Sequence, residues 1–137
     1  MVNPAFIKQF IIEGSTESIS RVVENILLLL KEENLQIEDM DFRIELVMRE
    51  MIANAVEHGC GKNNDSSQIK INLEIKEEYI SISVEDQGEG FEWKKRDLET
   101  LPIFAENGRG LVIINKTADR IEFNDCGNKI KVYFEFN

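Results

Sequence analysis

Two oxygen-bearing side chains, Glu50 and Asn54, lie four residues apart in a segment whose apolar residues recur at helical spacing. Residues at i and i+4 share one face of a helix, so this carboxylate and this amide would project side by side. Mg²⁺ prefers oxygen ligands and usually keeps several waters while it touches substrate phosphates. Asn54 is therefore a candidate metal ligand, and Glu50 is a candidate general base for an attacking hydroxyl. The competing interpretation is a solvated helix face that ends in an ordinary histidine, His58.

Asp86 comes directly after the alternating apolar run 80–84, at the predicted end of a strand. A carboxylate held at a strand end is a fixed hydrogen-bond acceptor, and the exocyclic amine of adenine is a donor. Gly88 and Gly90 follow, and the missing Cβ of a glycine lets backbone come close to a ligand. A glycine-rich turn with a polar cap is the alternative interpretation of this D-x-G-x-G string.

A second glycine loop, Gly108-Arg109-Gly110, stands immediately before the apolar run 111–114. Free backbone N–H groups at a helix N-terminus form an anion site, and the Arg109 guanidinium adds a cation that could meet phosphate. The chain contains neither a G-x-x-x-x-G-K-[ST] loop nor a G-x-G-x-x-G loop after a strand, so this would not be a P-loop or Rossmann site. A tight turn into a helix is the alternative for this loop. Taken together, the three motifs favour a site for Mg-ATP.

The hydrophobic pattern places these motifs on a small set of predicted helices and strands. Predicted strands cover 6–12, 69–75, 80–84, 121–124 and 129–136. The first predicted helix runs from an N-cap at Ser15 or Thr16 to Asn34, the second from Asp39 or Asp41 to Gly59, and the third over 110–117. Hairpins join the strands, and helices and strands are partly segregated. This order predicts an α+β two-layer sandwich with a mixed, mostly antiparallel sheet and helices on one face.

The composition fits one globular domain, because the 137 residues are 42% hydrophobic and 31% charged. The net charge of -10 argues against direct nucleic acid binding, which needs clustered Lys and Arg, and leaves basic protein surfaces as candidate partners. The N-terminus does not resemble a signal peptide, and no apolar run reaches the roughly 20 residues that cross a bilayer. Cys60 and Cys126 suit free thiols in a reducing cytosol. We therefore expect a cytoplasmic protein with one domain over residues 1–137 and no membrane contact.

The three motifs, in this order and in these predicted elements, resemble the N, G1 and G2 boxes of the GHKL ATPase superfamily. E-x-x-x-N near a helix end, D-x-G-x-G after a strand and G-x-G opening a helix carry the resemblance. Within the superfamily, the string EMIANAVEHG (50–59), the small size and the variant NGRGL (107–111) look most like the anti-sigma-factor serine/threonine kinases of bacterial partner-switching systems. The resemblance covers nearly the whole chain.

The resemblance implies a Bergerat-type, histidine-kinase-like ATPase fold and an ATP-dependent protein serine/threonine kinase. It assigns Mg²⁺ to Asn54, the general base to Glu50 and the adenine contact to Asp86. The remaining nucleotide contacts would come from the glycines of the two loops: Gly88, Gly90, Gly108 and Gly110. Arg109 is included as a further nucleotide contact because its positive charge could meet a phosphate. The implied partners are a sigma factor and a small anti-sigma-factor antagonist that is phosphorylated on a serine. Members of the family are often homodimers.

Residues 91–107, which would form the ATP lid, are few and include no glycine. The short lid favours an alternative, a nucleotide-binding regulatory protein without kinase activity that sequesters a protein partner. A histidine kinase catalytic domain ranks third. Such a domain normally works with a helix that bears a phosphoacceptor histidine, and His58 lies instead at the end of the helix that carries Glu50.

Overall fold

The computed structural model describes residues 6–56, 68–86, 109–124 and 128–137, which form five strands and three helices. The strands are β1 (Phe6–Glu13), β2 (Gln68–Ile75), β3 (Tyr79–Glu85), β4 (Arg120–Phe123) and β5 (Lys129–Glu135). The helices are α1 (Thr16–Glu32), α2 (Met40–Ala55) and α3 (Arg109–Thr117). In this part of the chain, no helix is long and apolar enough to cross a membrane.

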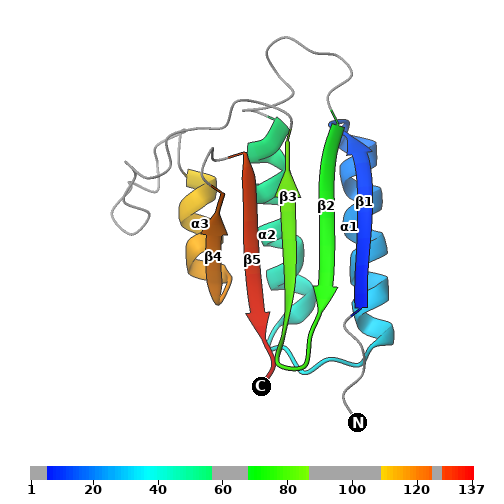
Figure 1. The fold of residues 1–137 in the computed structure, drawn as a ribbon, viewed down its shortest axis with the longest axis vertical. Coiled ribbons are helices and arrows are strands. Elements are labelled where there is room, and N and C mark those ends of the chain that lie inside the picture. The colour runs from blue at the N-terminus through cyan, green and yellow to red at the C-terminus, as the bar shows by residue number, and fades with distance from the viewer. Residues whose placement is uncertain (1–5, 57–67, 87–108, 125–127) are drawn as a thin grey trace.

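The strands form one sheet in the order β1-β2-β3-β5-β4, and all four pairings between neighbours are antiparallel. The three helices lie on the same face of this sheet (Figure 1). The predicted α+β sandwich with helices on one face is therefore confirmed. The sheet, predicted as mixed and mostly antiparallel, is antiparallel at every described pairing.

Helix α1 begins where the sequence offers a capping side chain. The Ser15 hydroxyl accepts a hydrogen bond from the Ser18 backbone N–H at 3.1 Å, which satisfies one of the free donors of the first turn. Glu17 in the first turn and Lys31 in the last turn have the signs that the helix dipole favours. The side chains that α1 buries follow the helical period: Val22, Val23, Ile26 and Leu30. Of the two predicted N-caps, Ser15 is thus confirmed.

Helix α2 begins at Met40, directly after Asp39. Of the two predicted starts, Asp39 is thus confirmed; it has a left-handed backbone (φ 50°), and its side chain makes no capping hydrogen bond. The face of α2 toward the sheet is fully apolar: Ile44, Val47, Met48, Met51, Ile52 and Ala55. The predicted end at Gly59 lies outside the described residues.

The core fills the space between the helices and the inner face of the sheet. Its largest fully buried side chains are Phe134, Ile26, Leu30, Ile44, Met48, Met51, Ile52, Ile69, Ile71, Leu73, Ile80 and Ile82. The strand members alternate along β2 and β3 with side chains on the other face, as the pleat requires. Side chains on one face of β2 and β3 therefore pack against the helices.

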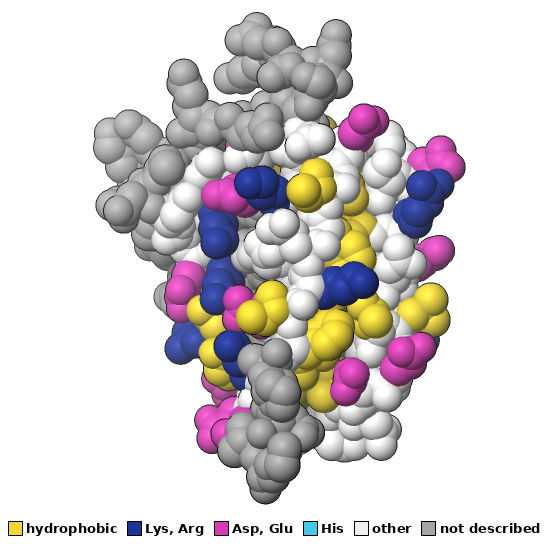
Figure 2. All heavy atoms as spheres, turned by 45° about the vertical axis from the view of Figure 1, so that its right-hand side comes forward, with side chains coloured by type: hydrophobic (Ala, Val, Ile, Leu, Met, Phe, Trp, Pro, Cys, Tyr) yellow, Lys and Arg dark blue, Asp and Glu magenta, His cyan; other side chains and the backbone are white. Residues whose placement is uncertain are grey.

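The other face of the sheet carries apolar side chains along the edge strand β1. Ile7 is 63% exposed and Ile11 is 52% exposed, and both alternate with Phe10 and Ile12, which pack against the core. Figure 2 brings the β1 side forward and shows hydrophobic side chains gathered there among basic and acidic side chains. An exposed apolar group of this kind on an edge strand is available to another protein surface.

Candidate functional site

The structure brings Glu50 of α2 into contact with Gly110 of α3. A Cβ placed on Gly110 would lie 2.7 Å from Glu50 Oε2, which is shorter than any ordinary van der Waals contact. The Glu50 carboxylate therefore lies directly against the backbone of the first turn of α3. Two of the three motifs, about 60 residues apart in the sequence, meet at this point.

Asn54 lies one turn beyond Glu50, near the end of α2. Both side chains are half-buried, so neither belongs to a fully solvated helix face. The end of α2, the end of β3 and the start of α3 all lie at the same end of the molecule (Figure 1). The predicted metal ligand and the predicted base therefore share the end of the fold where the glycine loop enters α3. Residues 57–67, which include His58, lie outside the described residues.

Asp86 directly follows β3 and is buried, with 6% of its surface exposed. Its backbone is held on both sides by Asn128. The Asp86 N–H donates to the Asn128 carbonyl at 2.9 Å, and the Asn128 side-chain amide donates to the Asp86 carbonyl at 2.9 Å. The residue predicted to contact adenine thus has a fixed backbone at the strand end, as a selective hydrogen-bond acceptor requires.

Asn128 is a further candidate site residue, which the sequence interpretation missed. Its side-chain oxygen accepts a hydrogen bond from the Asn124 amide, and Asn124 in turn accepts from the Lys129 backbone N–H at 3.2 Å. These bonds close the β4–β5 hairpin and at the same time hold Asp86. The signal was present as one asparagine at the end of the predicted strand 121–124 and another just before the predicted strand 129–136, because Asn side chains near turns commonly bond to nearby backbone.

The remaining predicted residues belong to the two glycine loops. Gly88, Gly90 and Gly108 lie outside the described residues. Arg109 is the first residue of α3, so the predicted entry of the loop into a helix is confirmed at Arg109 and Gly110. The backbone N–H groups in the first turn of a helix have no partners within the helix, and such groups suit an anion such as a phosphate. The Glu50 carboxylate thus lies against the helix start that the sequence predicts as the anion site.

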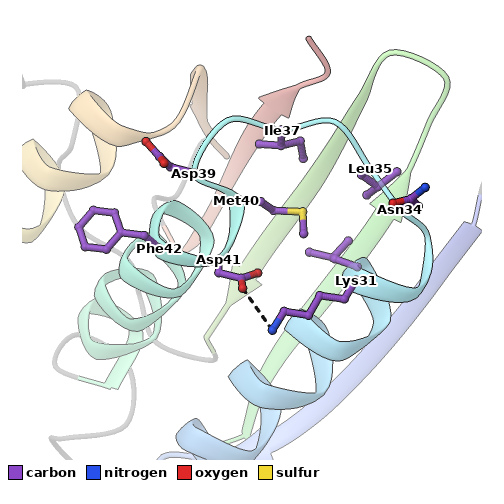
Figure 3. Close-up of a pocket in the computed structure, with 9 residues that line it drawn as sticks. Lys31, Asn34, Leu35, Ile37, Asp39, Met40, Asp41 and Phe42 are labelled. Carbon is purple, nitrogen blue, oxygen red and sulfur yellow. Dashed lines mark ion pairs between the residues drawn. The ribbon is translucent and has the colours of Figure 1, made fainter.

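A pocket of about 510 Å³ lies at the opposite end of the molecule, where α1 leads into α2. Lys31 and Asp41 face each other there, with Nζ and Oδ2 3.2 Å apart, and Ile37 and Met40 contribute apolar surface (Figure 3). None of the predicted site residues lines this pocket. Among the described residues, the groups with candidate chemistry therefore gather away from it, around the Glu50–Gly110 contact.

Comparison with known proteins finds serine-protein kinases among the relatives of this chain. The serine-protein kinase RsbW of Oceanobacillus iheyensis is 33% identical over 90 residues, which cover 60% of this chain and 56% of that protein. The serine-protein kinase RsbW of Staphylococcus epidermidis is 29% identical over 85 residues, which cover 56% of this chain and 54% of that protein. The chain thus spans about half the length of the curated relatives it matches.

A solved structure and a family match complete the comparison. The catalytic domain of the histidine kinase ThkA, in a nucleotide-free form, superposes with a TM-score of 0.56 at 18% identity. The superposition covers 94% of this chain and 96% of that domain, so the two share a fold. Residues 13–134 match the family described as the histidine kinase-like ATPase domain. This match takes in both Glu50 and Gly110, and the chain belongs to the histidine kinase-like ATPase domain family.

Proposed function

We propose that this chain is an ATP-binding anti-sigma factor with serine/threonine protein kinase activity toward a small anti-sigma-factor antagonist. The observation that carries the proposal is the Glu50 carboxylate lying against Gly110, at the start of helix α3. A general base and a phosphate-binding helix start are the two groups that transfer from ATP to a hydroxyl needs close together. The similarity to serine-protein kinases RsbW supports the same reaction class.

The proposed reaction assigns one role to each group. Glu50 takes the proton of a serine hydroxyl on the antagonist while the serine oxygen bonds to the γ-phosphorus of ATP. The bond from that phosphorus to the bridging oxygen breaks, and ADP leaves with the electron pair. Mg²⁺, when bound, would neutralise the phosphate charge, and Asn54 is the side chain proposed to hold it.

Nucleotide recognition falls on the two motifs around this centre. Buried Asp86 is proposed to accept a hydrogen bond from the adenine amine, on a backbone that Asn128 holds at 2.9 Å. The phosphates are assigned to the first turn of α3 and to the loops before it: Gly88, Gly90, Gly108, Arg109 and Gly110. A Cβ added at Gly110 would lie 2.7 Å from Glu50 Oε2, so a larger side chain at this position would displace the Glu50 carboxylate.

The proposed partners are proteins. The net charge of -10 disfavours nucleic acid and favours a partner with a basic surface, which suits a sigma factor. The exposed Ile7 and Ile11 on edge strand β1 support a homodimer in addition, because they form an apolar surface that the chain itself leaves open. We further propose a cytoplasmic protein with one domain over residues 1–137.

The test separates nucleotide binding from transfer. In calorimetry, Asn54→Ala should abolish the gain in ATP affinity that Mg²⁺ gives the wild type. With a cognate antagonist, Glu50→Gln should bind ATP as well as the wild type but transfer phosphate about 10²–10⁴ times more slowly. Glu45→Gln is the matched control, because Glu45 lies on the same helix and pairs with Arg49. Unchanged transfer by Glu50→Gln would exclude the base assignment.

A second function is favoured by the few residues between the glycine loops, 91–107. In that case the chain binds nucleotide for structure and sequesters a protein partner without phosphorylating it. ATP would then bind, and no phosphoserine would form on any antagonist supplied. Mass spectrometry of the antagonist after incubation with Mg-ATP distinguishes the two functions.

A further inference from the structure

Arg43, in the first turn of α2, holds three separate segments together. Its guanidinium donates to the Thr117 carbonyl from Nε at 3.2 Å and from Nη2 at 2.9 Å. It also donates to the Glu38 carbonyl from Nη1 at 3.1 Å, and to Asp119 Oδ1 from Nη2 at 3.2 Å. The guanidinium carbon lies 5.2 Å from the ring centroid of Phe134 in the core. This side chain is only 19% exposed.

The most informative of these bonds end on Thr117, which is the last residue of α3. The final carbonyls of a helix lack partners within the helix, and a cation there also meets the negative end of the helix dipole. Arg43 therefore caps the C-terminus of α3 from a neighbouring helix. Gly110, at the other end of α3, touches Glu50, which lies on α2 as Arg43 does.

The spacing of these two contacts is the same on both helices. Seven residues separate Arg43 from Glu50, and seven separate Gly110 from Thr117, which is about two turns in each case. Helices α2 and α3 therefore pack antiparallel and are joined at both ends of the contact. An isolated helix of nine residues is marginal in water, so α3 depends on such contacts for its position.

The sheet fixes Arg43 in turn. Asp119 pairs with Arg43 through Oδ1, while its Oδ2 accepts the Glu135 backbone N–H at 2.7 Å. The Asp119 backbone N–H donates to the Tyr133 carbonyl at 2.9 Å. Asp119 is thus held on β5, and it gives the guanidinium one orientation. A preorganised guanidinium fixes its bonding partner more closely than a mobile ammonium would.

We propose that Arg43 is a positioning residue for the nucleotide site: by holding the C-terminus of α3, it sets where the N-terminus of α3 meets the phosphates and Glu50. The inference rests on the proposed function, because it assigns phosphate binding to the start of α3. It predicts a selective effect. Loss of Arg43 weakens contacts to the phosphates and leaves the adenine contact at Asp86, on β3, in place.

The first test compares ATP with adenosine, which lacks the phosphates. Calorimetry on Arg43→Gln is expected to show an ATP affinity about tenfold below the wild type, with adenosine affinity within about twofold. Arg43→Lys keeps the charge but loses the forked set of donors, so its ATP affinity should lie between those of the wild type and Arg43→Gln. Arg49→Gln is the matched control on the same helix, since Arg49 pairs with Glu45 one turn away, and this variant should bind both ligands as the wild type does. Equal losses for ATP and adenosine, or no loss for ATP, would overturn the proposal.

A second measurement does not depend on nucleotide. Amide hydrogen exchange in α3 should be faster in Arg43→Gln than in Arg49→Gln, because one end of the helix is released. Unchanged exchange in α3 would overturn the inference even if ATP binds. If the wild type binds neither ATP nor adenosine while α3 exchanges faster in Arg43→Gln, the proposed function fails and the role of Arg43 in holding α3 stands.

A milder variant serves if Arg43→Gln does not fold. Asp119→Asn removes the charge that orients Arg43 and keeps an oxygen to accept the Glu135 N–H. It should lower ATP affinity in the same direction by a smaller factor, about threefold, and leave adenosine affinity unchanged. A normal ATP affinity together with normal exchange in α3 would count against the proposal.

Discussion

Substituting Gly110 by Ala tests the contact on which the proposed site depends. Gly110 lies in the first turn of α3, where an Ala would ordinarily stabilise a helix. The added Cβ would lie 2.7 Å from Glu50 Oε2, and ordinary contact begins at about 3.4 Å. The carboxylate oxygen must therefore move by at least about 0.7 Å. Since that oxygen ends a flexible side chain, the chain should still fold.

The expected energies follow from two opposing effects. Replacing a helical Gly by Ala raises the free energy of unfolding by about 0.5 kcal/mol, the low end of the usual range, because the site is in the first turn of the helix. Displacing Glu50 costs a similar amount, about 0.5–1 kcal/mol, when its side chain leaves a preferred rotamer. In the wild-type background, Gly110→Ala should thus change stability by about zero. With Glu50→Ala already present, the same change should stabilise the protein by about 0.5 kcal/mol.

The assay is a double-mutant cycle measured by urea unfolding. The expected coupling between Gly110→Ala and Glu50→Ala is about 0.5–1 kcal/mol, just above the 0.3–0.5 kcal/mol by which distant sites depart from additivity. Gly110→Ala combined with Glu45→Ala is the control and should be additive, because Glu45 pairs with Arg49 on its own helix. Additive behaviour in the first cycle would show that Glu50 and Gly110 do not touch.

Three further predictions concern other parts of the molecule. Ile82→Ala should cost about 2–5 kcal/mol in urea unfolding because Ile82 is fully buried, whereas Ile11→Ala, on the exposed face of β1, should cost under about 0.5 kcal/mol. Asn128→Ala should weaken the binding of ATP and of adenosine equally in calorimetry, because it releases the Asp86 backbone and leaves the start of α3 in place. A loss of affinity confined to ATP would contradict this. Burial, and then a hydrogen bond with a neighbouring Glu, raise the pKa of Tyr133 above its ordinary 10.0. The folded state favours the neutral hydroxyl of Tyr133. Its contribution to the free energy of unfolding is therefore complete below pH 10.0 and is lost as the pH rises through the raised pKa. Unfolding free energies above pH 10.0 should accordingly fall less steeply for Tyr133→Phe than for the wild type.

Much of the fold could be predicted because it depends on local periodicity. The alternation in 69–75 and 80–84 specifies two strands with one buried face, and the structure has them as Gln68–Ile75 and Tyr79–Glu85. The cap at Ser15 was equally local, since its bond to Ser18 spans three residues. The start of α2 was harder, because Asp39 is held by a left-handed backbone and not by a side-chain cap.

The contacts that join the candidate site could not be predicted in the same way. Arg43 and Thr117 are 74 residues apart, and nothing in the hydrophobic pattern relates the start of one helix to the end of another. The link from Asn128 to Asp86 spans 42 residues and depends on the order of β3 and β5 in the sheet. Such long-range pairs depend on how the helices and strands are arranged in the complete fold, and the local patterns of a single sequence do not give that arrangement.

The role of Gly110 shows how a correct residue can have an incomplete explanation. The sequence interpretation chose this glycine because a missing Cβ lets the backbone approach a phosphate. In the structure Gly110 has an ordinary helical conformation, so the glycine is not needed for a left-handed φ. The Glu50 carboxylate occupies the space that a Cβ would fill, so a larger residue at this position must displace that carboxylate. The glycine of one motif and the acid of another are thus a single packing unit, and the effect of replacing one on stability should depend on whether the other is present.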